Sequence, residues 1–167
     1  MLPVVWLAAC SIEVDEDKHT GAADVDIHTP LADLAVRANS DGVDTGLAVH
    51  QGARPTRHRG RGPSNAKVSI DGPLFGLRVA TAEYEDDASP DEILDFYKKE
   101  MAAYGDVMEC RGNLDFKGRL GRPVCRERWR SREVSLVVGT EREHRIMAVE
   151  PRGSGSKFAV VHVRTDH

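Results

Sequence analysis

The stretch SPDEILDFYKKEMAAYG at residues 89–105 constrains the fold most, because it predicts a helix in a chain otherwise patterned as strands. Ser89 can cap the first turn, Pro90 fits the first helical position, and Glu92 completes a capping box. Gly105 supplies a stop after the last apolar position. The apolar residues at helical spacing are Ile93, Phe96, Tyr97, Met101 and Tyr104. An amphipathic helix of this kind needs a surface to pack on.

The surface is predicted by six stretches with strand character around the helix. They are KVSIDG (67–72), LFGLRVATAEY (74–84), DVMECR (106–111), EVSLVVGT (133–140), RIMAVEP (145–151) and KFAVVHVRT (157–165). The last three are separated by turns of the lengths that hairpins use. One helix among many strands predicts an α+β fold, an antiparallel sheet with one amphipathic helix, about 90–104, packed on one face. We expect this domain to occupy residues 66–167.

The sequence before residue 66 divides into three segments. The polar residues 10–24 predict an acidic tether. Apolar residues alternate on either side of Thr29-Pro30, which predicts a short β-hairpin over residues 25–38. Gly, Pro and Arg dominate residues 39–65, which predict a flexible loop.

Charge is segregated along the chain, although the net charge is only −4 and the isoelectric point about 6.0. That balance argues against a dedicated nucleic-acid binder, since such domains carry a clear excess of Lys and Arg. Residues 13–33 are strongly acidic, whereas residues 111–132 are strongly basic. One end of the chain is therefore acidic and one later stretch is basic.

The basic stretch contains a candidate anion-binding row. Its members stand at every second position and are Arg126, Arg128, Arg130 and Arg132. An extended backbone would place all four on one face, where they could bind phosphate, an anionic glycan or an acidic protein partner. The alternative is that residues 130–133 form a hairpin turn, because Val134 and Leu136 would otherwise continue the arginine face into the core.

The N-terminal letters LAAC, Leu7-Ala8-Ala9-Cys10 followed by Ser11, resemble the lipobox of bacterial lipoproteins. The resemblance implies cleavage before Cys10, lipidation of Cys10 with acyl chains such as palmitate, and attachment to a membrane of the bacterial cell envelope. Residues 1–9 then read as a truncated signal segment, since they are apolar but hold no Lys or Arg. If this segment is not a signal, the expected location is the cytoplasm.

The cysteine count supports the same compartment. The chain has three cysteines, so if Cys10 takes a lipid, Cys110 and Cys125 form the natural pair. A disulfide closing a loop of roughly 15 residues contributes on the order of 3 kcal/mol in the chain-entropy model. Lipidation and the disulfide both require an exported protein in an oxidising environment.

Two further resemblances concern fold and compartment rather than activity. YEDDASPDEILDFYKKEMAAYG resembles a strand–helix–strand segment of bacterial envelope proteins that have no assigned activity, and the likeness covers residues 84–110. ADVDIHTPLADLAVRAN, near residues 24–37, resembles one rung of an adhesin-type repeat, V-x-I-x-T-x-x-G-x-L-x-V, with Ala32 where the repeat has Gly.

The sequence assigns no catalytic residue, cofactor or metal ligand. The chain lacks G-x-S-x-G, H-E-x-x-H, phosphate-loop and dinucleotide motifs, and no two of its histidines stand four apart. The leading hypothesis is a lipid-anchored envelope protein with a non-enzymatic binding or structural role, whose partner is an envelope protein or an anionic glycan. The alternatives are an anion-binding module built on residues 111–132, and an enzyme of unrecognised type with Glu100 in a cleft.

Overall fold

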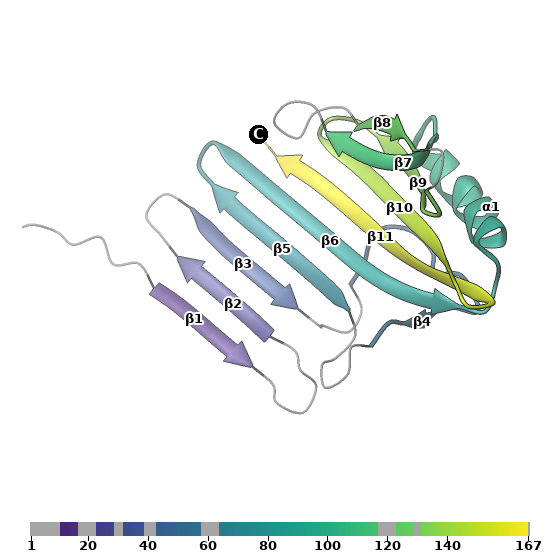
Figure 1. Ribbon diagram of the computed structural model, residues 1–167. Helices are drawn as coiled ribbons and strands as arrows, with labels where there is room; N and C mark the ends of the chain where they lie inside the picture. Colours follow the sequence, from purple (N-terminus) through teal and green to yellow (C-terminus); the bar gives the residue numbers. More distant parts are fainter. Residues whose placement is uncertain are drawn as a thin grey trace, which may run out of the picture.

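The computed structural model describes residues 11–16, 23–28, 32–38, 43–57, 64–116, 123–128 and 131–166, which form one antiparallel sheet with one α-helix (Figure 1). The strands are β1 (Ser11–Glu16), β2 (Ala23–His28), β3 (Asp33–Ala38), β4 (Arg54–Pro55), β5 (Asn65–Gly72), β6 (Phe75–Asp86), β7 (Met108–Phe116), β8 (Pro123–Glu127), β9 (Val134–Gly139), β10 (Glu143–Arg152) and β11 (Gly155–Asp166). Their order in the sheet is β1-β2-β3-β5-β6-β11-β10-β9-β7-β8, and β4 pairs with β6.

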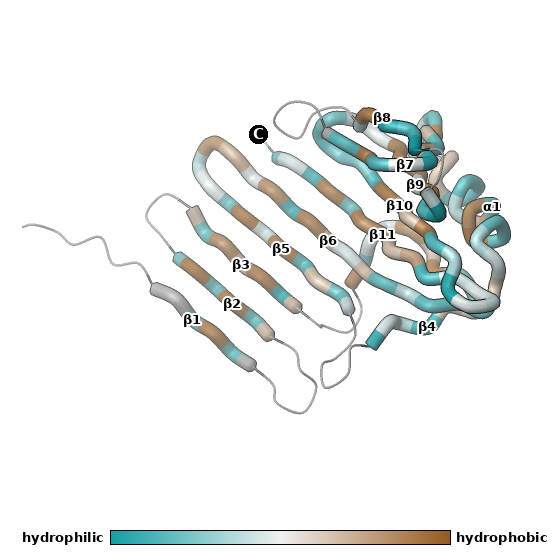
Figure 2. The backbone as a smooth tube through the Cα atoms, in the orientation of Figure 1, coloured by the Kyte–Doolittle hydropathy of each residue, from teal (hydrophilic) through white to brown (hydrophobic). Residues whose placement is uncertain are grey.

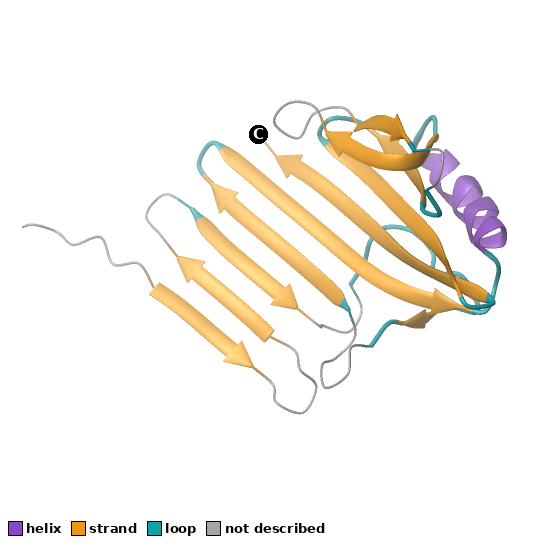
Figure 3. Cartoon of the chain, viewed as in Figure 1, coloured by secondary structure: helices purple, strands orange, loops and turns teal. Residues whose placement is uncertain are grey.

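The helix α1 (Pro90–Met101) begins at the predicted capping box and continues into a short 3-10 turn, η1 (Ala102–Tyr104). The amide of Glu92 donates to Ser89 Oγ at 3.4 Å, and the amide of Ser89 donates to Glu92 Oε2 at 2.8 Å. Gly105 ends the helical region with a φ of 131°, which favours glycine. The helix packs against β9, β10 and β11. Figure 3 shows it at one end of the sheet. The predicted α+β fold is confirmed.

The hydrophobic core lies between α1 and the sheet. It is rich in aromatic contacts, because the ring of Phe158 on β11 lies 5.4 Å from Tyr84 and 5.5 Å from Tyr97. Its buried members are Leu47, Ala82, Tyr84, Ile93, Leu94, Tyr97, Met101, Val134, Leu136, Val138, Met147, Val149, Phe158 and Val160. Leu47 comes from the loop 43–53, which therefore packs on the helix-covered side of the sheet.

The sheet has two chemically different faces, which we call the helix face and the open face. On the open face, aligned positions build rows of apolar side chains. One row crosses six strands and consists of Val14, Val25, Val36, Val68, Val79 and Val163. A second row consists of Ile27, Leu34, Ile70 and Leu77, and the next aligned position is the buried Thr165 of β11. Figure 2 shows the resulting alternation of hydrophobic and hydrophilic residues along β2 and β5.

The sheet extends further toward the N-terminus than the predicted domain boundary at residue 66. Residues 11–16 of the predicted tether form β1, because Val14 alternates with Glu13 and Asp15 and pairs with Val25 of β2. The predicted hairpin forms as β2 and β3, and β3 pairs with β5, so the hairpin belongs to the same sheet. Part of the predicted loop 39–65 is also ordered against the sheet through β4. Residues 1–10, with the predicted signal segment and Cys10, lie outside the described residues.

Candidate functional site

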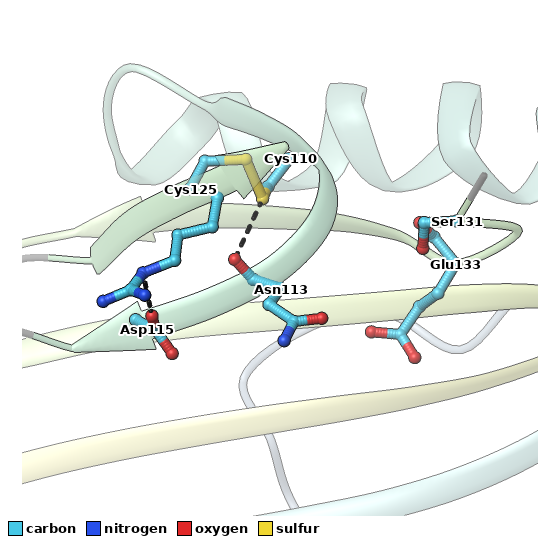
Figure 4. Close-up of a disulfide and its surroundings, with 7 residues drawn as sticks. Cys110, Asn113, Asp115, Cys125, Ser131 and Glu133 are labelled. Atoms are coloured by element: carbon cyan, nitrogen blue, oxygen red, sulfur yellow. Dashed lines mark hydrogen bonds and ion pairs between the residues drawn. A yellow bond between two sulfur atoms is a disulfide. The ribbon is translucent and has the colours of Figure 1, made fainter. Parts of the chain in front are cut away.

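The β7–β8 hairpin carries the predicted disulfide. Cys110 of β7 is bonded to Cys125 of β8, with a Cα–Cα distance of 5.4 Å (Figure 4). Cys110 is fully buried, and its sulfur lies 3.7 Å from the carbonyl oxygen of Asn113. This is a packing contact, because a disulfide sulfur has no hydrogen to donate. The predicted pairing of the two cysteines is confirmed.

Three arginines share one face of this hairpin. Asn113 pairs with Arg126, and the amide of Arg128 donates to the carbonyl of Arg111 at 3.0 Å. Residues two apart on a strand point to the same side, so Arg111, Arg126 and Arg128 lie on the face opposite the disulfide. All three side chains are exposed. The hairpin therefore presents a compact group of guanidinium ions.

Carboxylates hold two of these arginines in place. Arg126 Nε lies 2.5 Å from Asp115 Oδ2, and Arg111 lies 2.9 Å from Glu109. Glu109 also accepts a hydrogen bond from Lys98 of α1 at 2.8 Å, and this bond lowers the pKa of the Glu109 carboxyl below its usual range. The ion pairs lower the net charge of the hairpin face but leave its arginines at the surface.

Three of the four arginines of the predicted row, Arg126, Arg128 and Arg132, lie among the described residues. β8 ends at Glu127, and the amide of Ser131 donates back to the carbonyl of Arg128 at 2.9 Å, so the extended run stops there. Arg132 is exposed in the following segment, and Arg130 lies outside the described residues. The pairing of β8 with β7 adds Arg111 as a neighbour of Arg128. Sequence alternation alone could not find this group, because it depends on the pairing of β8 with β7.

A second polar cluster joins the loop 43–57 to the start of α1. His50 Nδ1 lies 2.7 Å from Asp86 Oδ2, and the Asp86 carboxylate is buried, with 3% of the side chain exposed. The amide of Ala88 donates to the other Asp86 oxygen at 2.8 Å. Arg54 forks onto Asp87 at 3.0 and 3.2 Å, which lowers the pKa of Asp87. These contacts tie the loop to the helix N-terminus.

A third cluster centres on Arg145 of β10. Its guanidinium lies 3.7 Å from the ring centre of Tyr104, and it donates to Glu143 at 3.1 Å. Glu143 also lies 3.0 Å from His162, while the Tyr104 hydroxyl donates to the carbonyl of Gly46 at 2.6 Å. The cluster therefore links two strands, η1 and the loop 43–57. This cluster and the His50 cluster both hold the loop 43–57 against the rest of the fold.

The remaining candidates are Glu100, a metal site and a membrane-spanning helix. Glu100 is partly exposed on α1. Within the described ranges, no group of three or more His, Cys, Asp or Glu side chains is placed to hold a metal ion. No helix in the same ranges has the length and apolar character needed to cross a membrane.

On β2, β3 and β5 the open face is lined by small and aliphatic side chains and carries no charged residue. On β2, β3, β5 and β6 its Val, Ile and Leu side chains are all partly exposed, whereas the core residues on the helix face are buried. Val14, on edge strand β1, is 66% exposed. Sheet faces lined by aliphatic side chains are normally covered by a second layer. The open face is therefore the candidate binding surface.

Comparisons of the chain with family models, with curated proteins and with solved structures find no match.

Proposed function

We propose that this protein is a lipid-anchored protein of the bacterial cell envelope with a non-enzymatic binding role, and that it binds its partner through the open face. The observation that carries the binding role is the row of six valines from Val14 to Val163, which is partly exposed on a continuous sheet. Contiguous apolar surface of this extent marks an interaction site more often than it marks bare solvent-facing surface.

Two observations support the envelope location. The Cys110–Cys125 disulfide persists only where thiols are not kept reduced, and envelope compartments meet this condition. Cys10, the candidate lipidation residue, directly precedes Ser11 at the start of β1. Lipid on Cys10 would therefore hold the edge of the sheet next to the bilayer.

The test of the anchor is the intact mass of the protein recovered from bacterial membranes without reductant, expressed with its natural upstream DNA. The expected species begins at Cys10, is heavier by the mass of acyl chains, and is lighter by two hydrogens because of one disulfide. A Cys10→Ser variant is the matched control and should lack acyl mass. Recovery of an unmodified chain that begins at Met1 would overturn the lipid anchor.

The second candidate function is anion binding by the β7–β8 hairpin, favoured by the shared face of Arg111, Arg126 and Arg128. Clustered guanidinium groups bind phosphate and sulfate oxygens through paired hydrogen bonds. Heparin is a suitable probe, because it is a polyanion without bases to read. Binding should weaken steeply between about 0.1 M and 1 M salt, where the Debye length falls from ~10 to ~3 Å.

The matched variants are Arg128→Ser, which removes a guanidinium from the hairpin face, and Arg164→Ser, which removes an exposed one from β11. Arg128→Ser should lower heparin retention and Arg164→Ser should not. If the two variants lowered heparin retention equally, the binding would depend only on the net charge of the protein. That result would overturn a site on the hairpin.

A further inference from the structure

We propose that the open face is the interface of a homodimer, in which two copies pack these faces together as a two-layer sandwich. This inference names the partner of the binding surface and rests on the proposed binding role. It is independent of the lipid anchor.

The first argument is the chemistry of the face. The central residues of both rows are aliphatic, from Val25 and Ile27 on β2 to Leu77 and Val79 on β6. The next aligned positions, Ala38, Ala66 and Thr81, are also uncharged. Charged side chains are depleted from the cores of protein interfaces. On β2, β3 and β5 the open face thus has the composition of an interface core.

The helix face of the same strands shows the opposite chemistry. Its positions carry Asp24, Asp26, Arg37, Lys67 and Arg78. Arg37 lies 2.8 Å from Asp26, and Arg78 lies 3.0 Å from Asp71. A division of this kind between faces is typical of a sheet with one face in water and one face covered. The covering layer for the aliphatic face is therefore missing from the described part of a single copy.

The extent of the face fits a dimer. Six strands spaced about 4.8 Å apart make it roughly 29 Å wide, and rows of alternate residues extend it roughly 17 Å along the strands, giving about 500 Å². A standard interface buries about 800 Å² per partner, of which about 56–65% is apolar. The apolar share of such an interface is thus about the area that the open face provides.

The fold leaves room for a second copy. Helix α1 and the core loop residue Leu47 pack on the helix face, so in a face-to-face pair they lie on the outside of both copies. Facing sheets pack about 10 Å apart with their strands within about 30° of parallel, and β-branched side chains interdigitate at that spacing. Rows of valine are self-complementary, as a two-fold interface requires.

The charges favour a protein copy over a bilayer. Membrane-binding surfaces combine apolar residues with Lys, Arg, Trp or Tyr at their rim. None of the open-face side chains on β2, β3, β5 and β6 is Lys, Arg, Trp or Tyr, so the rim that favours a bilayer is lacking on these strands. A two-fold axis parallel to the strands, at the centre of the six-strand face, would place β1 of each copy opposite β11 of the other.

The test uses the full chain with Cys10→Ser, so that neither a lipid nor an intermolecular disulfide can join copies. Sedimentation equilibrium at micromolar concentration should give twice the chain mass of 18.4 kDa. Val68→Lys places a charge in the middle of the valine row and should raise the dissociation constant at least about 100-fold. Ser69→Lys, its neighbour on the helix face, should leave the dimer intact.

A milder substitution keeps the test valid if Val68→Lys does not fold. Val68→Cys in the same chain should react slowly with a maleimide at concentrations where the dimer forms and faster on dilution. Ser69→Cys should react at one rate at all concentrations. Monomeric mass together with concentration-independent labelling of Val68→Cys would overturn the dimer.

The bilayer alternative is tested with the same proteins and vesicles of phosphatidylcholine and phosphatidylglycerol. The dimer predicts that the Cys10→Ser chain stays in the supernatant. The opposite result is a monomer that sediments with the vesicles, and whose binding is lost in Val68→Lys but kept in Ser69→Lys. It would show that the open face binds lipid and not a second copy. Because Cys10 is absent throughout, neither outcome bears on lipid anchoring, which the intact mass decides separately.

Discussion

Two buried residues, Cys110 and His144, make the stability of the fold depend on solution conditions. Cys110 is fully buried, and its bond joins β7 to β8 through Cys125, which stands 15 residues further along the sequence. His144 of β10 is 6% exposed, and burial lowers the pKa of its imidazole below the ordinary value of 6.5. Both residues tie stability to solution conditions, one to redox state and the other to pH.

Loss of the disulfide should lower the free energy of unfolding. The double variant Cys110→Ser/Cys125→Ser is expected to lose about 2–4 kcal/mol, because the unfolded chain regains the entropy of the closed loop. Urea denaturation without reductant measures the loss, and reductant should cause a similar loss in the unaltered chain. Cys10→Ser is the control and should keep the original midpoint. Equal midpoints for all three proteins would contradict a stabilising bond.

Acidification should destabilise the protein through His144. Because the folded pKa lies below that of the unfolded chain, the unfolded state takes up the proton first. The stabilisation is therefore complete above about pH 6.5 and is lost as pH falls toward the folded pKa. His144→Gln should flatten the fall in melting temperature between about pH 7 and pH 5.

His28 provides the opposite sign as a control. Its hydrogen bond with Asp33 raises the pKa of this exposed imidazole, so its contribution is present at low pH and lost as pH rises. His28→Gln should leave the acid-side fall in melting temperature in place. A fall that survives His144→Gln but disappears with His28→Gln would show that the assignment to His144 is wrong.

Among the elements, α1 is the one whose position decides the core. Its capping box starts the helix at Pro90, and this start sets which side chains face the sheet. Four helix residues, Ile93, Leu94, Tyr97 and Met101, are then buried against β9, β10 and β11. A substitution that weakens the first turn should therefore also disturb the packing of these four residues in the core.

Ser89→Ala should lower the free energy of unfolding by about 1 kcal/mol, because the amide of Glu92 loses its side-chain acceptor. Thermal or urea denaturation measures the change. Ser154→Ala removes a serine hydroxyl from the exposed turn between β10 and β11 and should be nearly neutral. The capping role would be contradicted if the two substitutions had the same effect.

At the scale of the whole molecule, the sheet has two parts that differ in how much of their surface is packed against another layer. β9, β10 and β11 pack under α1, whereas β1, β2 and β3 are single-layered in the described part of one copy. Regions with few buried apolar contacts open with lower free energies than the core. Pairing of open faces would supply the missing layer to the N-terminal strands.

Amide hydrogen exchange should reveal this difference. In the Val68→Lys variant, amides of β2 and β3 should exchange at least about 10-fold faster than those of β10 and β11. In the parent chain the gap should narrow as the protein concentration rises, because dimerisation protects the N-terminal strands. Uniform protection of both regions in a monomeric sample would contradict the two-part description.

Much of the local structure followed from the sequence, because its causes lie within a few residues of one another. The Ser89-to-Glu92 capping box and the spacing of Ile93 and Tyr97 predicted α1. Period-two alternation predicted β5, β6 and β9 to β11. The count of three cysteines, with Cys10 assigned to a lipid, predicted the bond between Cys110 and Cys125. The function and the lipid anchor at Cys10 stay predictions.

Only the tertiary structure decided which residues far apart in the chain lie side by side. Val36 and Val68 became neighbours through the pairing of β3 with β5, and Arg111 joined Arg128 through the pairing of β7 with β8. Strand register is fixed by hydrogen bonds between distant segments, which no local pattern specifies. The sequence by itself determined that the strands have one apolar side, and the tertiary structure decided that these sides form one face and that α1 covers the other.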